Sequence, residues 1–241
     1  MLVRHDTDLW SVEHVFGWQG GLVRIPVRMT VFRLAGNRLV LHSPVPLSAE
    51  LRGALDALGE VGDIVVPWAH GRFAEAASRA YPAARLLAAP RPPSRRRRLA
   101  FAGTIADQPP ADWGGEIECR LVRGFRLEEV LFFHRASRTL VLTDLCFHIQ
   151  RSESRLARGF FKANDMWQRF GPSRIIRNAT VSDRAAFRAS LDRLDEWDFD
   201  RIVPGHGDVL EHGSAEMIRT AWQATTRASS PARSRGISRE R

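Results

Sequence analysis

The chain has 241 residues, 44% of them hydrophobic, and a formal net charge of +9 at pH 7. This length and apolar content allow a full core in one domain or two, while two cysteines are too few for the disulfide framework of a small secreted protein. The N-terminus lacks the apolar segment of a signal peptide and no apolar run approaches the ~18 residues of a membrane span, so we expect a cytoplasmic protein without membrane association.

The first half of the chain alternates short apolar strands with short helices. Residues 24–34 and 38–43 are rich in Val, Leu, Ile and Phe, and the turn residues between them, 35–37, predict a β-hairpin. Ser48 is expected to cap a helix that Gly59 ends, because leucines repeat between them at helical spacing. The sequence then predicts a strand at residues 63–66, a helix at 73–80, a strand at 85–89, a loop at 90–98 and irregular chain at 103–116.

The second half opens on strands and ends on helices. A strand at residues 117–122 precedes the clearest hairpin, formed by residues 127–134 and 139–144. The remaining expected elements are a helix over 152–170, a helix capped by Ser182 or Asp183 and ending near residue 194, a strand at 201–204 and a helix at 213–225. Alternating strands and helices in both halves indicate a layered α/β fold, with sheets faced by helices.

Three apolar strands are each followed directly by a polar residue with metal-binding or acid-base capacity. His70 follows the strand at residues 63–66, Asp144 ends the second hairpin, and His206 follows the strand at 201–204. Because α/β folds place their sites at the carboxyl ends of strands, we expect these three side chains to lie together.

The order and spacing of these three segments resemble the metallo-β-lactamase superfamily. There a strand ends in Thr-His-x-His-x-Asp-His, a later hairpin ends in Gly-Asp, and a final strand ends near a lone His. In this chain the corresponding segments are residues 67–73, 143–145 and 204–207. The resemblance implies a metallo-β-lactamase-like αββα sandwich, in a single domain over residues 1–225.

A closer likeness is to a divergent bacterial branch of that superfamily, known only as a domain of unknown function. It is carried by residues 42–46, 128–145 and 197–207. The resemblance implies a hydrolase-like protein that acts on an unknown small molecule or binds an unknown small molecule or protein.

The departures from the superfamily pattern bear most on function. Of the four metal-site residues in the first motif only His70 is retained, because Trp68, Arg72 and Phe73 have no lone pair for a metal. The superfamily's next histidine is replaced as well, by residues 124–126. We expect Trp68 and Phe73 to line the pocket instead.

Two interpretations of the remaining residues stay open. In the first, His70, Asp144 and His206 hold one divalent metal (Zn, Fe or Mn) and the protein is a mononuclear metallohydrolase with Asp144 as the candidate catalytic residue. In the second, no metal is bound: Arg72 forms an ion pair with Asp144 that closes the site, and the protein is a non-catalytic binding or scaffold descendant of the fold.

Other chemistry is weaker in this sequence. His134 lies beside the hairpin turn, about 17 Å along the strand from Asp144, and is expected to be structural. Cys146 follows Asp144 closely and His148 is near, so its strand-end position leaves a reactive thiol as an alternative. The arginine-rich block at residues 95–98 and the Arg/Ser-rich tail at 226–241, which we expect to be disordered, have no interleaved aromatic residues, so nucleic acid is not an expected partner.

Overall fold

The computed structural model describes residues 1–18, 20–67, 70–90 and 99–223. The expected tail at 226–241, the arginine block at 95–98 and Trp68 lie outside the described residues. None of the helices in the described ranges has the length and apolar character needed to cross a bilayer.

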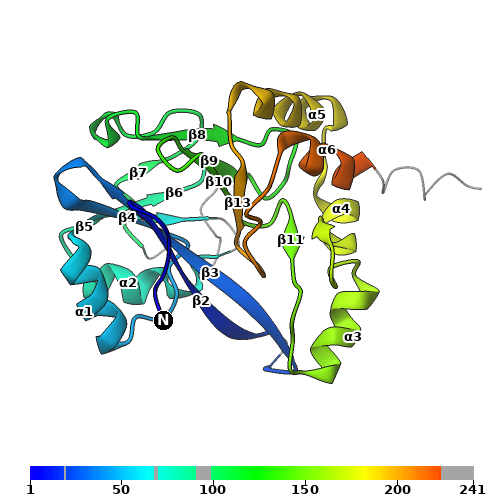
Figure 1. The fold of residues 1–241 in the computed structure, drawn as a ribbon, viewed down its shortest axis with the longest axis horizontal. Helices are drawn as coiled ribbons and strands as arrows, with labels where there is room; N and C mark the ends of the chain where they lie inside the picture. The colour runs from blue at the N-terminus through cyan, green and yellow to red at the C-terminus, as the bar shows by residue number, and fades with distance from the viewer. Residues whose placement is uncertain (19, 68–69, 91–98, 224–241) are drawn as a thin grey trace, which may run out of the picture.

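The larger of the two main sheets has seven strands that follow one another in chain order (Figure 1). They are β1 (Val3–Asp6), β2 (Leu9–Trp18), β3 (Val23–Leu34), β4 (Arg38–His42), β5 (Glu60–Val66), β6 (Arg85–Ala88) and β7 (Gly103–Thr104). The expected hairpin is confirmed as the antiparallel pair β3–β4, and β4, β5, β6 and β7 run parallel to one another.

The second sheet has four strands in the order β13, β10, β9, β8. Their bounds are β8 (Ile117–Leu121), β9 (Val130–His134), β10 (Thr139–Leu142) and β13 (Arg201–Pro204). β9 and β10 form the expected hairpin, and β13 pairs with β10 in parallel, so both β10 and β13 end at the same edge of the sheet. A small ladder joins β11 (Phe147–His148) to β12 (Phe170–Gly171).

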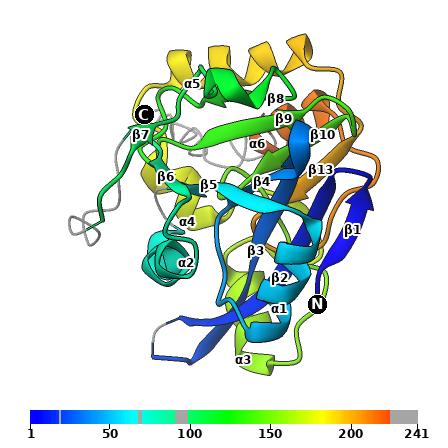
Figure 2. The ribbon, with the colours of Figure 1, turned by 90° about the vertical axis from the view of Figure 1, so that its left-hand side faces the viewer.

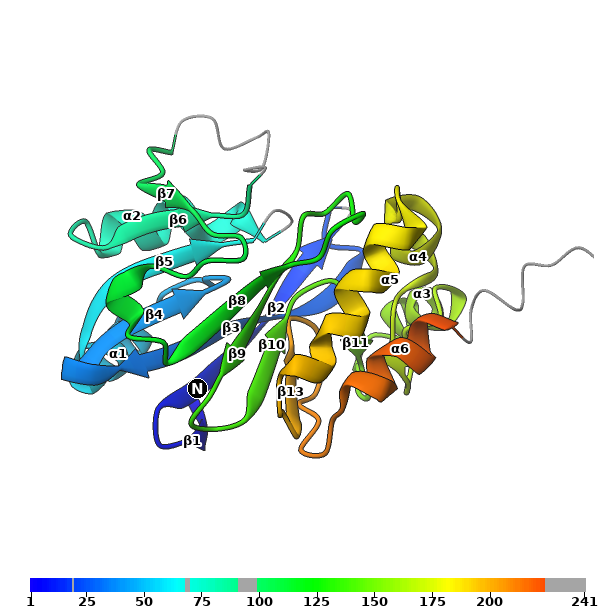
Figure 3. The same ribbon diagram turned by 90° about the horizontal axis from the view of Figure 1, so that it is seen from above.

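Helices cover the outer faces of both sheets (Figure 3). Helices α1 (Ala49–Leu58) and α2 (Ala74–Ala80) pack on the larger sheet, and α5 (Arg184–Asp192) and α6 (Ala215–Gln223) on the smaller one. Two more helices, α3 (Arg155–Ala163) and α4 (Arg174–Thr180), follow β11. Three apolar cores separate these four layers, one beneath each pair of helices and one between the sheets. The expected αββα sandwich is therefore confirmed.

The cap signals in the sequence act as expected. The hydroxyl of Ser48 accepts a hydrogen bond from Leu51 N at the start of α1, and Asp183 accepts from two backbone N–H groups at the start of α5. Gly59 follows α1 with a positive φ of 157°, and a Cβ there would overlap the backbone of Asn37. These caps fix where the helices turn back to the sheets.

One expected element is shorter than its pattern. The helix expected over residues 152–170 is α3, which ends at Ala163. The side chain of Asn164 donates to Phe160 O, and Asp165 and Gln168 then adopt positive φ, so local hydrogen bonding and backbone reversal end the helix. The same stretch makes room for β12 and α4, which the sequence pattern did not predict.

Two strands before residue 23 were missed as well. β1 and β2 carry charged and polar residues on the exposed side, which weakened their strand pattern. β2 pairs with β3 over ten register positions, from Leu9 opposite Phe32 to Trp18 opposite Val23. The distal ends of this long ribbon reach α3 in two views (Figure 1, Figure 2), and Trp18 packs against Phe160 at a ring distance of 5.3 Å.

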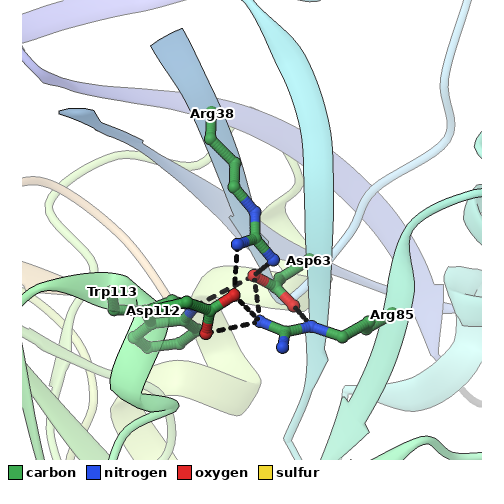
Figure 4. Close-up of polar contacts among 5 residues, drawn as sticks. All are labelled: Arg38, Asp63, Arg85, Asp112 and Trp113. Carbon is green, nitrogen blue, oxygen red and sulfur yellow. Dashed lines mark hydrogen bonds and ion pairs between the residues drawn. The ribbon is translucent and has the colours of Figure 1, made fainter. Parts of the chain in front are cut away.

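A charged network surrounds the buried carboxylate of Asp63 (Figure 4). Asp63 of β5 is fully buried and accepts hydrogen bonds from Arg38 Nη2 at 2.8 Å and from Arg85 Nε at 2.6 Å. Trp113, just before β8, donates its indole N–H to Asp63 at 2.9 Å. Asp112 bonds both arginines from outside, so the network ties β4, β5 and β6 to the segment that enters the second sheet.

Asp63→Ala is expected to lower the free energy of unfolding by about 3 kcal/mol, because removal of one partner leaves buried donors unpaired. Urea denaturation with linear extrapolation measures the change. The control is Glu75→Ala, which breaks an exposed pair with Arg79 and should cost less than ~1 kcal/mol. Equal small losses in both variants would contradict this role of Asp63.

Candidate metal centre

The three polar residues expected at strand ends lie together in the structure. His70 follows β5, Asp144 follows β10, and His206 follows β13, and one ligand atom from each lies within 4.8 Å of the others. β5 belongs to the larger sheet, whereas β10 and β13 belong to the smaller one. The cluster therefore bridges the two sheets at the carboxyl ends of their strands.

The atoms that face one another are the Nε2 atoms of both histidines and the carboxylate of Asp144. The two Nε2 atoms are 3.0 Å apart. His206 Nε2 lies 3.3 Å from Asp144 Oδ1, and His70 Nε2 lies 3.7 Å from Asp144 Oδ2. The side chains of all three residues are about nine-tenths buried, with 8%, 11% and 8% of their surface exposed.

The orientation of His206 is fixed by the backbone of β3. Its Nδ1 lies 2.7 Å from Pro26 O, and a carbonyl oxygen can only accept, so Nδ1 carries the proton and Nε2 offers its lone pair when the ring is neutral. Phe147 stacks on the ring at 4.9 Å. Gly207 continues the turn with φ 89°, where a Cβ would overlap His148 O.

His70 is oriented by Ser43, which follows β4. The Ser43 hydroxyl lies 2.8 Å from His70 Nδ1, so the ring is held with Nε2 toward the cluster. Ser43 adopts φ 58°, an uncommon conformation for a residue with a side chain. Ser43 is a polar residue that follows a strand, like His70, Asp144 and His206. The sequence pattern that identified those three residues could therefore also have identified Ser43.

Asp144 is positioned through its own backbone by Glu129. The buried carboxylate of Glu129 accepts from Thr143 N at 2.7 Å and from Asp144 N at 2.9 Å. Burial and the negative charge of Asp144 raise the pKa of Glu129 to about 8, although both backbone N–H groups favour its charged form. Glu129 was missed because, next to Glu128 at the start of a strand, it resembles one of two solvated charges.

The charges of the cluster leave room for a cation. Neutral His206 would direct the Nε2 lone pair at a carboxylate oxygen, and the two would repel unless a proton or a metal ion lay between them. Burial acts to raise the pKa of Asp144, but His70 and His206 outweigh it and hold that pKa well below its usual range. Two imidazole nitrogens and one carboxylate, each oriented by a second hydrogen bond, fit a single divalent metal.

Arg72 does not form the ion pair expected with Asp144. Its guanidinium lies over the ring of Phe16, 4.7 Å from the ring centre, and within the described residues the ion-pair partners of Asp144 are His70 and His206. Stacking on an aromatic face stabilises the cation without removing Asp144 from the cluster. The site-closing pair is therefore not present in this structure.

A cavity of about 540 Å³ opens beside the cluster. Ser43, His70, Asp144 and His206 line it together with Phe73, as expected for that side chain, while Trp68 lies outside the described residues. Most of the remaining lining is apolar and comes from β2, β3, α3 and α4. A mostly apolar cavity with a few convergent polar groups is the usual form of a small-molecule site.

The other sequence candidates lie elsewhere. His134 bonds Ser137 at 2.7 Å and pairs with Thr139 at the far end of β10, which agrees with the expected structural role. Burial raises the pKa of the Cys146 thiol well above its usual value, so Cys146 is not a thiolate nucleophile. One further buried histidine, His42 at the end of β4, stays neutral in the core, because burial, and then the charge of His70, lowers its pKa to about 3.

Solved structures with the same architecture are metallo-β-lactamases and related proteins. The chain is similar to the DIM-1 metallo-β-lactamase exposed to ceftazidime, with 12% identity, a TM-score of 0.61 and coverage of 93% of this chain and 97% of that chain. It is also similar to a metallo-β-lactamase from Pontibacter korlensis, with 14% identity and a TM-score of 0.60. That match covers 92% of this chain and 98% of that chain. The metal-soaked Flv1 flavodiiron core from Synechocystis sp. PCC6803 has 12% identity and a TM-score of 0.63. That match covers 95% of this chain and 62% of that chain.

The layers, the strand order and these similarities define a protein with the metallo-β-lactamase fold. Residues 6–168 match the family model described as a domain of unknown function (DUF4336), and the chain belongs to that family. No curated protein sequence matches the chain. The expectation of a divergent bacterial branch stays a prediction.

The raised pKa of Glu129 predicts a pH dependence of stability. The folded state keeps a proton that the unfolded state loses near pH 4.5, so this contribution is complete below pH 4.5 and is lost as pH rises toward 8. Glu129→Gln should therefore flatten the fall in unfolding free energy between pH 6.5 and 8 by about 1.4 kcal/mol per pH unit. Urea denaturation at several pH values measures both slopes, and parallel profiles would contradict the assignment.

Proposed function

We propose that the protein is a mononuclear metal-dependent hydrolase in which His70, Asp144 and His206 hold one divalent ion, Zn, Fe or Mn. The observation that carries the proposal is the convergence of three ligand atoms within 4.8 Å. The hydrogen bond from His206 Nδ1 to Pro26 O adds support, because it leaves the facing Nε2 free to bind a metal.

The residues around the cluster favour one ion rather than two. Two-metal sites need further ligands from the first strand-end motif, and Arg72 and Phe73 stand there without a lone pair to offer. Arg72 adds a positive charge to the lining of the same cavity, which further disfavours a second cation.

A divalent ion in such a donor set supplies Lewis-acid activation of water or of a substrate carbonyl. The residues of the chain position this chemistry and limit the access of water. Asp144, the candidate catalytic residue, presents a carboxylate oxygen to the cluster that can bind the ion or accept a proton. Ser43 orients His70, Glu129 holds the backbone of Asp144, and the apolar cavity walls limit the access of water.

The non-catalytic alternative has less structural support than the hydrolase. It required Arg72 to neutralise Asp144, whereas the Arg72 guanidinium stacks on Phe16. We therefore favour a hydrolase that acts on a small molecule. We also propose that residues 1–225 form one domain, supported by the apolar core that the two sheets share, and a cytoplasmic location, supported by the two unpaired cysteines.

Protein purified without a histidine tag or chelator should contain about one divalent ion per chain, because one complete ligand set is present. Elemental analysis measures the content. Asp144→Asn and His206→Ala should lose the ion, whereas His212→Ala, which removes an exposed histidine outside the cluster, should keep it. A wild-type chain that stays metal-free after incubation with Zn, Fe and Mn salts would overturn the proposal.

Metal removal is expected to destabilise the wild-type protein. Saturation at about 100 times the dissociation constant should stabilise the fold by about 2.7 kcal/mol, so a chelator should lower the melting temperature of wild type and leave that of Asp144→Asn unchanged. A chelator effect of equal size in both proteins would indicate metal binding elsewhere.

Metal-loaded wild type, screened on ester, thioester and phosphoester substrates, should show hydrolysis that Asp144→Asn lacks.

A further inference from the structure

The cavity beside the metal centre carries information about its ligand. Its volume of about 540 Å³ suits a small organic molecule rather than a lone ion or a peptide. The wall away from the cluster is almost entirely apolar. It is built from the distal part of the β2–β3 ribbon and from the region of α3 and α4 by Phe16, Trp18, Ile25, Phe160, Met166 and Ile176.

Large apolar side chains continue from this wall to the solvent. Trp18 is 36% exposed and Ile175 is 51% exposed, and both line the cavity. Apolar side chains at the rim are unfavourable in contact with water, and a ligand that covers them removes this cost. The rim therefore favours a ligand whose body is itself apolar and reaches the mouth of the cavity.

Arg72 adds one positive charge to this apolar lining. The residue is exposed, and within the described part of the chain no carboxylate pairs with it. The two other arginines that lie over aromatic rings in the described residues each have a carboxylate partner: Arg33 pairs with Asp8 and Arg120 with Glu196. The Arg72 guanidinium lies over Phe16 of the cavity wall, and its N–H groups can donate to a ligand.

We propose that the cavity binds an amphiphilic organic anion: an acyl-chain compound with one carboxylate or phosphate group. The chain lies along the apolar wall, and Arg72 donates to the anionic group. This assignment deepens the proposed hydrolase and rests on it only for the position of the reacting bond, since neither the apolar wall nor Arg72 requires the metal.

The test uses isothermal titration calorimetry on the full chain after chelator treatment, with octanoate and its uncharged counterpart octan-1-ol as probes. Octanoate is kept below its micelle concentration and octan-1-ol below its solubility limit. Octanoate should bind about tenfold or more tightly than octan-1-ol, as expected for a hydrogen bond to a charged group. Affinity should rise about fourfold per added methylene from hexanoate to decanoate. Equal binding of acid and alcohol, or affinity independent of chain length, would overturn the proposal.

Variants separate the charge of Arg72 from general electrostatics. Arg72→Gln should abolish the preference for octanoate and keep the binding of octan-1-ol, and Arg72→Lys should restore part of the preference because it keeps the charge without the planar fork. Arg52→Gln is the matched control, since Arg52 is an exposed arginine on α1 away from the cavity. Retention of the full preference in Arg72→Gln would show that another group binds the anion.

Failure of this proposal can be distinguished from failure of the hydrolase. Asp144→Asn should lose the metal and still bind octanoate in the chelator-treated assay, whereas Arg72→Gln should keep the metal and lose the anion preference. Octanoate preference in a wild-type chain that never binds metal would leave the pocket assignment standing without the hydrolase. A wild-type chain with full metal content but no preference for octanoate would overturn the pocket assignment and leave the hydrolase proposal standing.

Discussion

Asp63 links the two sheets through its buried carboxylate, and the candidate metal centre is assembled from residues of both sheets. Its buried carboxylate holds Arg38 and Arg85 on the neighbouring strands and Trp113 on the chain that enters the second sheet. The network pairs two carboxylates with two guanidiniums, so the buried charge of Asp63 is compensated. The three candidate ligands come from both sheets, so the 3.0 Å spacing between the two imidazole nitrogens depends on how the sheets are held together.

Strand β5 carries Asp63 in its middle and leads to His70 at its end, and the two residues have different charged neighbours. In the middle of β5, Asp63 meets its cations within the chain, and the result is rigid structure. Beyond the carboxyl end of β5, His70 faces Asp144 and His206, and among the residues that the structure describes no arginine or lysine forms an ion pair with Asp144. A proton or a metal ion must complete that group, and this need distinguishes a site from a structural network.

The first strand-end motif contributes a cation and an aromatic ring to the cavity. In the superfamily that the sequence resembles, this motif serves the metals, whereas here Arg72 and Phe73 face the cavity and Phe16 fixes the guanidinium. The β2–β3 ribbon supplies both Phe16 and the carbonyl of Pro26 that orients His206. One long ribbon therefore lines the apolar wall and orients the ring of His206, a candidate ligand.

The sequence by itself determined the layered α/β order, the two hairpins and the three strand ends that carry His70, Asp144 and His206, because these features follow from local periodicity, turn residues and caps. The tertiary structure decided the rest. The direction of Arg72 depends on Phe16, the buried state of Glu129 on the turn after β10, and the tautomer of His206 on a carbonyl 180 residues away. A side chain's rotamer, pKa and hydrogen-bond partner are set by neighbours in space, and no local pattern in the chain records which distant residues those neighbours will be.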